Sequence, residues 1–405
     1  MIHVRPFRAW RPVPHLAHLV GSRSFLQYSA AEIKARLEEN PYTFLHVIHA
    51  DHERAGSSRS EHFDAVRDKF MEFTQRGILQ REEQPVFYAY AQTAAAFSSL
   101  GIIGVVDVGD YEEGRIKVHE HTLANREELF TDYLQHTGIN AEPVLLAMPD
   151  DAAIEAELAR AAEGTPLFDF TTTDQVRHRY WRMGDAAVQQ RLHEQFSRLP
   201  ALYIADGHHR CASSALLARR TKAAPGTPGA GFMALIVPER QLHIFNYDRT
   251  VSGLNGLSPA KFMDALKRIG PVRELPGGAS HPTAGNVQFL VDGSWHELRF
   301  RPPTSDRPVE ALDAERLGSQ VLGPVLGLGD MRTEPRLHFV PGTAGVQALE
   351  HAVATGRADA AFHLRAVSFA QLRAVADSGG CMPPKSTWIE PKLRSGLTIY
   401  SLEDA

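Results

Sequence analysis

One short stretch concentrates side chains that act on charged molecules: Asp206-Gly207-His208-His209-Arg210. A carboxylate, two imidazoles and a guanidinium stand next to one another, and ionisable groups at this density are costly to bury in a packed core. A carboxylate can hold a hard metal ion, while the basic groups favour phosphate or carboxylate ligands. The alternative is a solvated Asp-Gly turn. A zinc site would need further ligands from elsewhere, because neighbouring histidines point in different directions on any regular element.

The elements on either side of this stretch determine where its side chains point. Residues 201–205 are apolar and typical of a strand, and residues 211–221 are typical of a helix. Gly207 favours the tight turn between them, since glycine accepts a positive φ at little cost. The basic residues therefore stand at a helix N-terminus, where backbone N–H groups favour anions. This arrangement predicts a phosphate or carboxylate site.

A second polar cluster, residues 117–122, precedes a charged helix predicted over 126–135. Taken alone, it is better explained as an edge strand with solvated charges. Together with the first cluster, it makes Glu120 a candidate general base and Lys117 or His119 a candidate for holding a substrate anion.

The third cluster spans residues 382–397 near the C-terminus and combines prolines, basic residues and hydroxyls without amphipathic periodicity. A rigid loop carrying Lys385, Thr387, Lys392 and Arg394 suits a polyanion such as a nucleotide phosphate. The alternative is a terminal segment that merely wraps the core. No Walker-type glycine loop and no dinucleotide fingerprint occurs in the sequence.

Composition excludes several classes of protein. The net charge of −5 provides no general basic field for nucleic acid or anionic membranes. No apolar run approaches the ~20 residues that a membrane span requires. With only two cysteines and no signal-peptide pattern at the start, we expect a cytoplasmic protein in a reducing compartment.

Strand and helix patterns alternate through most of the chain. Strands are predicted at 2–10, 42–49, 85–92, 98–108, 114–117, 144–148, 167–172 and 176–183, and helices at 29–39, 59–76, 150–163 and 184–198. Ser29, with Glu32 three residues later, predicts a capping box at the start of the first of these helices. The 176–183 strand is expected to expose a basic face. Residues 232–237 and 242–247 resemble a hairpin, a helix is expected over 258–269, and a second hairpin is centred on Asp292-Gly293. We expect a catalytic core over 1–250, an appended helix–hairpin module over 251–305, and a C-terminal segment over 306–405 that returns to the core.

The three clusters together resemble the bacterial domain-of-unknown-function family 1015. The resemblance rests on Ala205 to Arg210, on His119-Glu120, and on the closing Met382 to Leu397 block, and it covers essentially the whole chain. A local pattern, Asp-Gly-His-His-Arg, is also similar to that of free-serine kinases with the ParB/sulfiredoxin-like fold. These resemblances imply an α+β fold: mixed sheets with a ParB/sulfiredoxin-like nucleotide-site core and a small appended helix–hairpin module.

The same resemblance implies roles for individual residues. Asp206, His208 and His209 with Glu120 would be catalytic, Asp206 would hold Mg²⁺, and Glu120 would act as base. Nucleotide phosphates of ATP or ADP would be bound by Gly207, Arg210, Lys385, Thr387, Lys392, Arg394 and Ser395. Substrate would contact Lys117, His119 and Trp388.

The sequence departs from the family pattern at two positions. Many members carry Pro-Tyr-Asp where this chain has Ser24-Phe25-Leu26, and an arginine where it has Leu123. The loss of the aspartate at Leu26 removes a possible metal ligand or base, which leaves altered substrate preference or lost activity open.

Three functions follow as hypotheses. The first is a nucleotide-dependent phosphotransferase acting on a small hydroxy amino acid such as serine. The second is a metal-dependent phosphatase of a small phosphorylated metabolite, with His208 and His209 as ligands. The third is a non-enzymatic nucleotide-binding protein. We expect a small-molecule substrate and a nucleotide as partners, without nucleic acid or membrane; the oligomeric state is left open.

Overall fold

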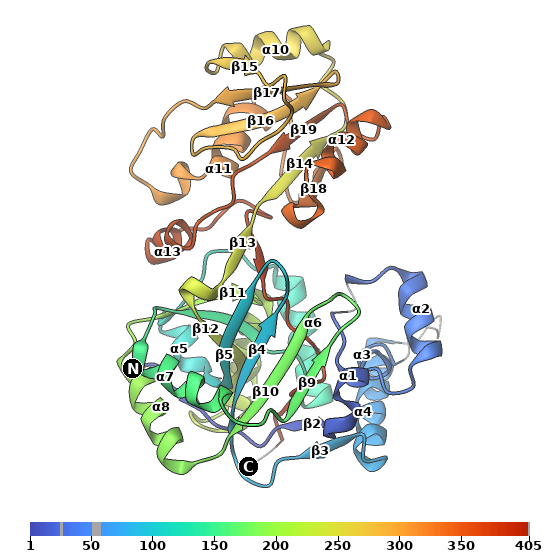
Figure 1. Cartoon of the computed structure of the whole chain (residues 1–405), viewed down its shortest axis with the longest axis vertical. Helices are drawn as coiled ribbons and strands as arrows, with labels where there is room; N and C mark the ends of the chain where they lie inside the picture. The colour runs from blue at the N-terminus through green and yellow to red at the C-terminus, as the bar shows by residue number, and fades with distance from the viewer. Residues whose placement is uncertain (25–26, 51–57, 404–405) are drawn as a thin grey trace. The chain divides into compact units, whose positions relative to one another are not determined.

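The computed structural model describes residues 1–24, 27–50 and 58–403, and the chain divides into two compact units. The first unit contains Met1–Lys117, His121–Leu242 and Pro391–Ala405, and the second contains Val118–Glu120 and His243–Glu390. Each unit combines helices with sheets (Figure 1), so the predicted α+β class with mixed sheets is confirmed.

The first unit is built on a mixed nine-stranded sheet in the order β6-β11-β8-β12-β5-β4-β10-β9, with β1 paired to β5. Its strands are β1 (Val4–Arg5), β4 (Phe87–Thr93), β5 (Ser98–Asp107), β6 (Ile116–Lys117), β8 (Val144–Met148), β9 (Phe168–Thr171), β10 (Arg177–Met183), β11 (Leu202–Asp206) and β12 (Gly231–Pro238). Every residue of β8 and β12 is buried. Such continuous apolar strands require cover on both faces, which places them in the interior of the sheet.

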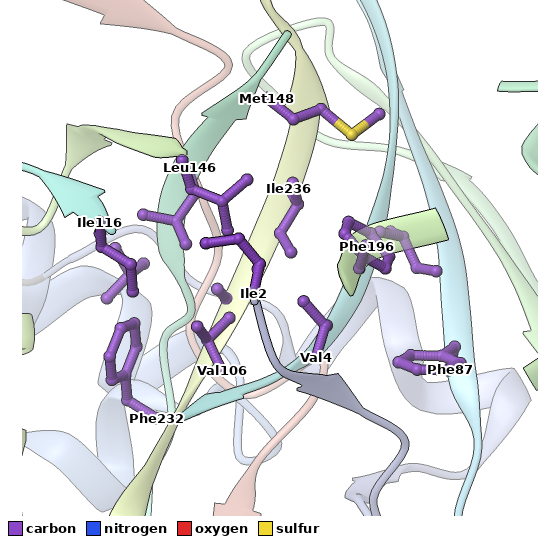
Figure 2. Packing of buried hydrophobic residues seen from close by; sticks show 14 of the residues in the cluster. Ile2, Val4, Phe87, Val106, Ile116, Leu146, Met148, Phe196, Phe232 and Ile236 are labelled. Atoms are coloured by element: carbon purple, nitrogen blue, oxygen red, sulfur yellow. The ribbon is translucent and has the colours of Figure 1, made fainter. Parts of the chain in front are cut away.

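Helices α7 (Ala152–Ala162), α8 (Ala186–Arg198) and α9 (His208–Thr221) pack on one face of this sheet. Phe196 of α8, with Phe87, Leu146 and Ile236 from the strands, belongs to one buried apolar cluster (Figure 2). Asp151 and Asp185 cap α7 and α8 by accepting hydrogen bonds from first-turn N–H groups. The apolar face therefore fixes α9, whose first residues belong to the cluster singled out from sequence.

A second apolar cluster of the first unit includes Val20, Phe44, Phe70, Phe73 and Ile399. The elements outside the large sheet are α1 (Ala17–Val20), α2 (Ala30–Glu39), α3 (Leu45–Ile48), α4 (Arg59–Gln75), α5 (Val108–Glu112) and α6 (Ala124–Thr137), with the strand pairs β2 (Trp10–Pro12)–β3 (Leu79–Arg81) and β7 (Ile139–Asn140)–β21 (Tyr400–Ser401). Ile399 also bridges to Trp10 through backbone hydrogen bonds, which ties the C-terminal segment into this unit.

The second unit carries an antiparallel six-stranded sheet in the order β15-β17-β16-β19-β14-β18. Its elements are β13 (His243–Phe245), β14 (Tyr247–Val251), α10 (Pro259–Lys267), β15 (Val272–Glu274), β16 (Asn286–Val291), β17 (Ser294–Arg299), α11 (Asp313–Leu317), β18 (Leu337–Pro341), α12 (Val346–Ala354), β19 (Ala360–His363), α13 (Phe369–Asp377) and β20 (Trp388–Glu390). A buried apolar cluster that includes Phe262, Phe289 and Phe362 joins α10 to this sheet. Residues 251–305 thus share one sheet with β18 and β19.

Several local predictions are confirmed. Ser29 and Glu32 form the expected capping box at the start of α2. The Asp292-Gly293 hairpin joins β16 to β17, and both turn residues have positive φ, as its tight turn requires.

Two local predictions are wrong. Residues 42–49 were predicted to form a strand, but they contain helix α3. Leu45 and Val47 are buried in this helix, and this packing outweighs the strand propensity of the segment. Residues 232–237 and 242–247 do not pair as a hairpin. β12 instead pairs with β5 and β8, and β13 pairs with β20.

Among the described residues, no helix combines the length and apolarity needed to cross a membrane.

Candidate active site

The Asp206–Arg210 turn has the predicted strand–turn–helix geometry. β11 ends at Asp206, Gly207 has a φ of +104°, and α9 begins at His208. Gly207 is the N-cap residue, and α9 receives no side-chain cap. The helix N-terminus therefore offers backbone donors of the kind that bind anions.

Arg210 ties this turn to the segment before β8. Its guanidinium lies 2.7 Å from the carboxylate of Glu142 and 3.1 Å from that of Asp206. It also donates to the carbonyl of Pro143 at 2.6 Å. Burial opposes the charge of Arg210, but the carboxylates of Glu142 and Asp206 outweigh it and raise the pKa of the guanidinium. Arg210 thus orients Asp206 from within the protein.

The C-terminal segment brings further groups to the same turn. The ammonium of Lys392 lies 3.8 Å from the Asp206 carboxylate. Ser395 donates a hydrogen bond from its hydroxyl to Glu142 at 3.0 Å. The first and third sequence clusters therefore meet within the first unit, with Glu142 joining them.

Arg394 is buried beside a shared carboxylate. Its guanidinium lies 2.5 Å from Asp174, which also pairs with Arg23. Burial acts to raise the pKa of Asp174, but the hydrogen bonds from Thr172 and Arg23 and the charge of Arg394 outweigh it and hold that pKa well below its usual value. Two guanidinium groups against one carboxylate leave a net positive charge here.

The β10 strand contributes a buried histidine to this region. His178 is fully buried, and its Nδ1 lies 2.7 Å from the hydroxyl of Tyr90. Burial and the positive charge of Arg394 lower the pKa of His178 to about 3, so the ring is neutral at pH 7. We expected basic side chains of this strand to be exposed. Arg177 and Arg182 are exposed, whereas His178 is buried.

The two histidines of the turn differ in environment. His208 is buried, whereas His209 is half-buried, and burial with the nearby charge of Arg126 lowers the pKa of His209. Across residues 1–24, 27–50 and 58–403, no group of three or more His, Cys, Asp or Glu side chains is arranged to hold a metal ion. A metal at Asp206 would need most of its ligands from a bound molecule.

The second cluster is divided between the units. Lys117 ends β6 in the first unit, paired with Tyr203 of β11. His119 and Glu120 belong to the second unit, where Met382 donates its backbone N–H to the carbonyl of His119 at 2.8 Å. His119 is buried, which lowers its pKa to about 4, while Glu120 is exposed. The second and third clusters thus meet within the second unit.

The remaining predicted residues also belong to the second unit. Lys385 is exposed, has a positive φ, and its ammonium lies 5.6 Å from the ring centroid of Tyr247. Thr387 is half-buried just before β20, and Trp388 donates from its indole to Glu390 at 2.9 Å. Lys385, Thr387 and Trp388 are thus grouped with Glu120, whereas Asp206, Lys392, Arg394 and Ser395 are grouped in the first unit.

Sequence reasoning missed Glu142, Asp174 and Arg23. Glu142 precedes Pro143 and strand β8, and Asp174 lies in the turn between β9 and β10. Acidic residues at strand ends are the one signal available from sequence, and it is shared by many solvated turns. Leu26, where the resemblance led us to expect an aspartate in many members, lies outside the described residues. Leu123 is the N-cap residue of α6 and provides no side-chain cap.

Residues 4–315 match a family described as a protein of unknown function, DUF1015. The chain belongs to this family. A comparison with curated proteins found no match.

Three solved structures are similar to the chain at low identity. A free serine kinase in complex with AMP is 15% identical, covers 74% of this chain and 91% of its own, and has a TM-score of 0.38. SbnI with a C-terminal truncation, from Staphylococcus aureus, is 11% identical over 71% of this chain and 82% of its own, with a TM-score of 0.38. A conserved hypothetical protein from Pyrococcus furiosus is 14% identical over 74% of this chain and 95% of its own, with a TM-score of 0.36.

Proposed function

We propose that this protein is a nucleotide-dependent phosphotransferase that acts on a small hydroxy amino acid, as a serine kinase does. The observation that supports this most is the position of Asp206 at the start of α9, between the cations of Arg210 and Lys392. Phosphoryl transfer depends chiefly on positioning and charge neutralisation, and this turn offers both.

The phosphates of ATP or ADP would lie against the N-terminus of α9. Lys392 would neutralise phosphate charge, and Gly207 would allow close approach of a phosphate to the backbone. Arg210 would hold the turn in place through Glu142, and Arg394 and Ser395 would extend the site along the C-terminal segment. We also propose phosphate binding by Lys385 and Thr387. Substrate would contact Lys117, His119 and Trp388.

Asp206 fits a Mg²⁺ ion that arrives with the nucleotide. Mg²⁺ is commonly bound by one or two carboxylates together with substrate phosphates, so a single partly exposed carboxylate suffices. When bound, the ion would neutralise charge that develops on the transferred phosphoryl group. His208 and His209 would orient the turn around Asp206.

Glu120 would act as the general base. Its exposed carboxylate can accept the proton of the acceptor hydroxyl while the hydroxyl oxygen bonds to the terminal phosphorus and the bond from that phosphorus to the bridging oxygen breaks, which releases ADP from ATP or AMP from ADP. We also propose that the core has a ParB/sulfiredoxin-like fold and that residues 1–250 form the catalytic core. Residues 251–305 would be an appended module; of the segment 306–405, Pro391–Ala405 belong to the first unit, whereas residues 306–390 belong to the second.

A thermal-shift assay and a turnover assay, each on wild type and on Glu120→Gln, test this proposal. ADP or ATP with Mg²⁺ should raise the melting temperature of wild type and variant alike, because binding to the folded state alone stabilises it. Turnover of nucleotide with serine should fall about a hundredfold or more in the variant, the usual contribution of a general base.

Glu128→Gln is the matched control, since Glu128 is an exposed acid on α6 that pairs with Arg220. It should leave both readings unchanged. A melting temperature that no nucleotide moves would contradict the proposal, as would full turnover in Glu120→Gln.

A further inference from the structure

A group of buried polar side chains lies on the face of the large sheet opposite α7, α8 and α9. There β4 and β10 pair in the register Tyr90↔Tyr180 and Gln92↔His178, so these four side chains share one face. They include the hydrogen-bonded His178–Tyr90 pair described above. Tyr180 and Gln92 lie outside that pair, and Gln92 has a buried amide.

The amide of Gln92 is buried without a partner. The side chain is 1% exposed, and neither its Nε2 nor its Oε1 has a hydrogen-bond partner within the described part of the chain. A buried amide that makes no hydrogen bond is costly, and native proteins contain few of them. Gln92 therefore has both a donor and an acceptor whose hydrogen bonds are not made within the described residues.

Arg394 lies close to His178, the cross-strand partner of Gln92, because Thr172 Oγ1 is 3.5 Å from both a terminal nitrogen of Arg394 and Nε2 of His178. It influences the ionisation of both His178 and Tyr90, the neighbours of Gln92 on the sheet face. The guanidinium pairs with Asp174 through its terminal nitrogen, whereas its Nε has no partner among the residues that the structure describes. Ser22, whose backbone pairs with that of Ser395, adds a buried hydroxyl that is also unpartnered there.

The donors and acceptors in this group define the ligand. Arg394 Nε and Gln92 Nε2 donate, and Gln92 Oε1 accepts, while His178 is neutral and adds no charge. An anion with two acceptor oxygens next to a hydrogen-bond donor would complement them. A carboxylate with an adjacent ammonium, the head group of an α-amino acid, has this chemistry.

This group is connected to the proposed phosphate site. Ser395, which follows Arg394, donates to Glu142, and Glu142 pairs with Arg210, which holds Asp206. All of these residues belong to the first unit. We propose that Gln92 and Arg394 form the subsite for the amino-acid head group of the acceptor; this inference rests on the proposed function.

Calorimetric titration in the presence of ADP and Mg²⁺ tests the subsite on the ligand side without any mutation. L-Serine should bind, whereas ethanolamine, which lacks the carboxylate, and 3-hydroxypropanoate, which lacks the ammonium, should each bind roughly tenfold to a hundredfold more weakly, the range for a lost hydrogen bond to a charged group. Equal affinity for all three compounds would overturn the inference.

Gln92→Leu tests the same subsite on the protein side. The variant should lose L-serine affinity by about tenfold or more while its affinity for ADP is unchanged. Its melting temperature without ligand should rise, because the unpartnered amide is gone. Gln190→Leu, at an exposed glutamine of α8, is the control and should bind serine as wild type does.

The outcomes separate this inference from the proposed function. If ADP binds and serine affinity is the same in wild type and Gln92→Leu, the subsite is wrong and the nucleotide site stands. If ADP itself does not bind to wild type, the proposed function fails first and the inference falls with it.

Discussion

At Asp206, one carboxylate is held by a guanidinium on the same helix and approached by an ammonium from the C-terminal segment. Arg210 is anchored in turn by Glu142, which limits the movement of the Asp206 carboxylate. An arrangement fixed in advance limits the reorganisation that phosphate binding would otherwise require. At the scale of single residues, we propose that Arg210 orients Asp206 in addition to its expected role in binding phosphate.

The buried ring of His178 predicts a specific dependence of stability on pH. Its folded pKa of about 3 lies below the ordinary value of about 6.5, because burial disfavours the charged ring. The unfolded chain therefore binds the proton first as pH falls. The stability that His178 contributes is fully present above pH ~6.5 and is lost as pH falls from there towards about 3.

Urea unfolding at pH 7 and pH 5 measures this contribution. Between these pH values, wild type should lose about 2 kcal/mol of unfolding free energy from this group alone. His178→Asn, which keeps a polar atom near the position of Nδ1, should lack that part of the loss. Equal pH dependence in wild type and variant would show that His178 is not held neutral by burial.

Gly207 lies between the end of β11 and the start of α9, so its backbone conformation sets the position of the Asp206 turn. Its φ of +104° is strained for any other residue, and a Cβ there would lie 3.1 Å from the Arg210 guanidinium. Gly207→Ala should cost about 1–2 kcal/mol of unfolding free energy from backbone strain. It should also weaken ADP binding, because it shifts the turn and the arginine that orients Asp206.

Gly226→Ala is the matched control for backbone strain. Gly226 has a φ of +81°, and nothing lies within 4 Å of the position that an added Cβ would take. The control should lose similar stability in urea unfolding but bind ADP as wild type does in calorimetry. Equal ADP affinities for wild type, Gly207→Ala and Gly226→Ala would show that the turn is not part of the nucleotide site.

Local sequence signals predicted the elements that depend on local chemistry. The strand, turn and helix around Asp206 follow from an apolar run, a glycine and a helical pattern, and the structure has all three. The capping box at Ser29 and the Asp292-Gly293 hairpin are of the same kind. In each case the decisive residues lie within a few positions of one another.

Features that depend on distant pairing were not predictable in this way. β12 has the length and composition of a hairpin strand, yet its partners are β5 and β8, which lie far away in sequence. Glu142 and Asp174 become site residues only because the C-terminal segment brings Ser395 and Arg394 against them. Contacts between residues so distant along the chain leave no periodic signal in a single sequence.

On the scale of the whole molecule, the closing segment of the chain supplies each unit with part of the candidate chemistry. Residues 381–382 lie with His119 and Glu120 in the second unit, and residues 392–395 lie with Asp206 and Glu142 in the first. We propose that the whole protein transfers a phosphoryl group from a nucleotide to a hydroxyl. The product of that reaction is measured on the full chain.

The most direct measurement is ³¹P NMR of the wild-type protein incubated with L-serine, Mg²⁺ and either ATP or ADP. We expect a new phosphomonoester resonance that grows as the nucleotide is consumed and that is absent with Glu120→Gln. Nucleotide that is bound but left intact, or inorganic phosphate as the sole product, would contradict it.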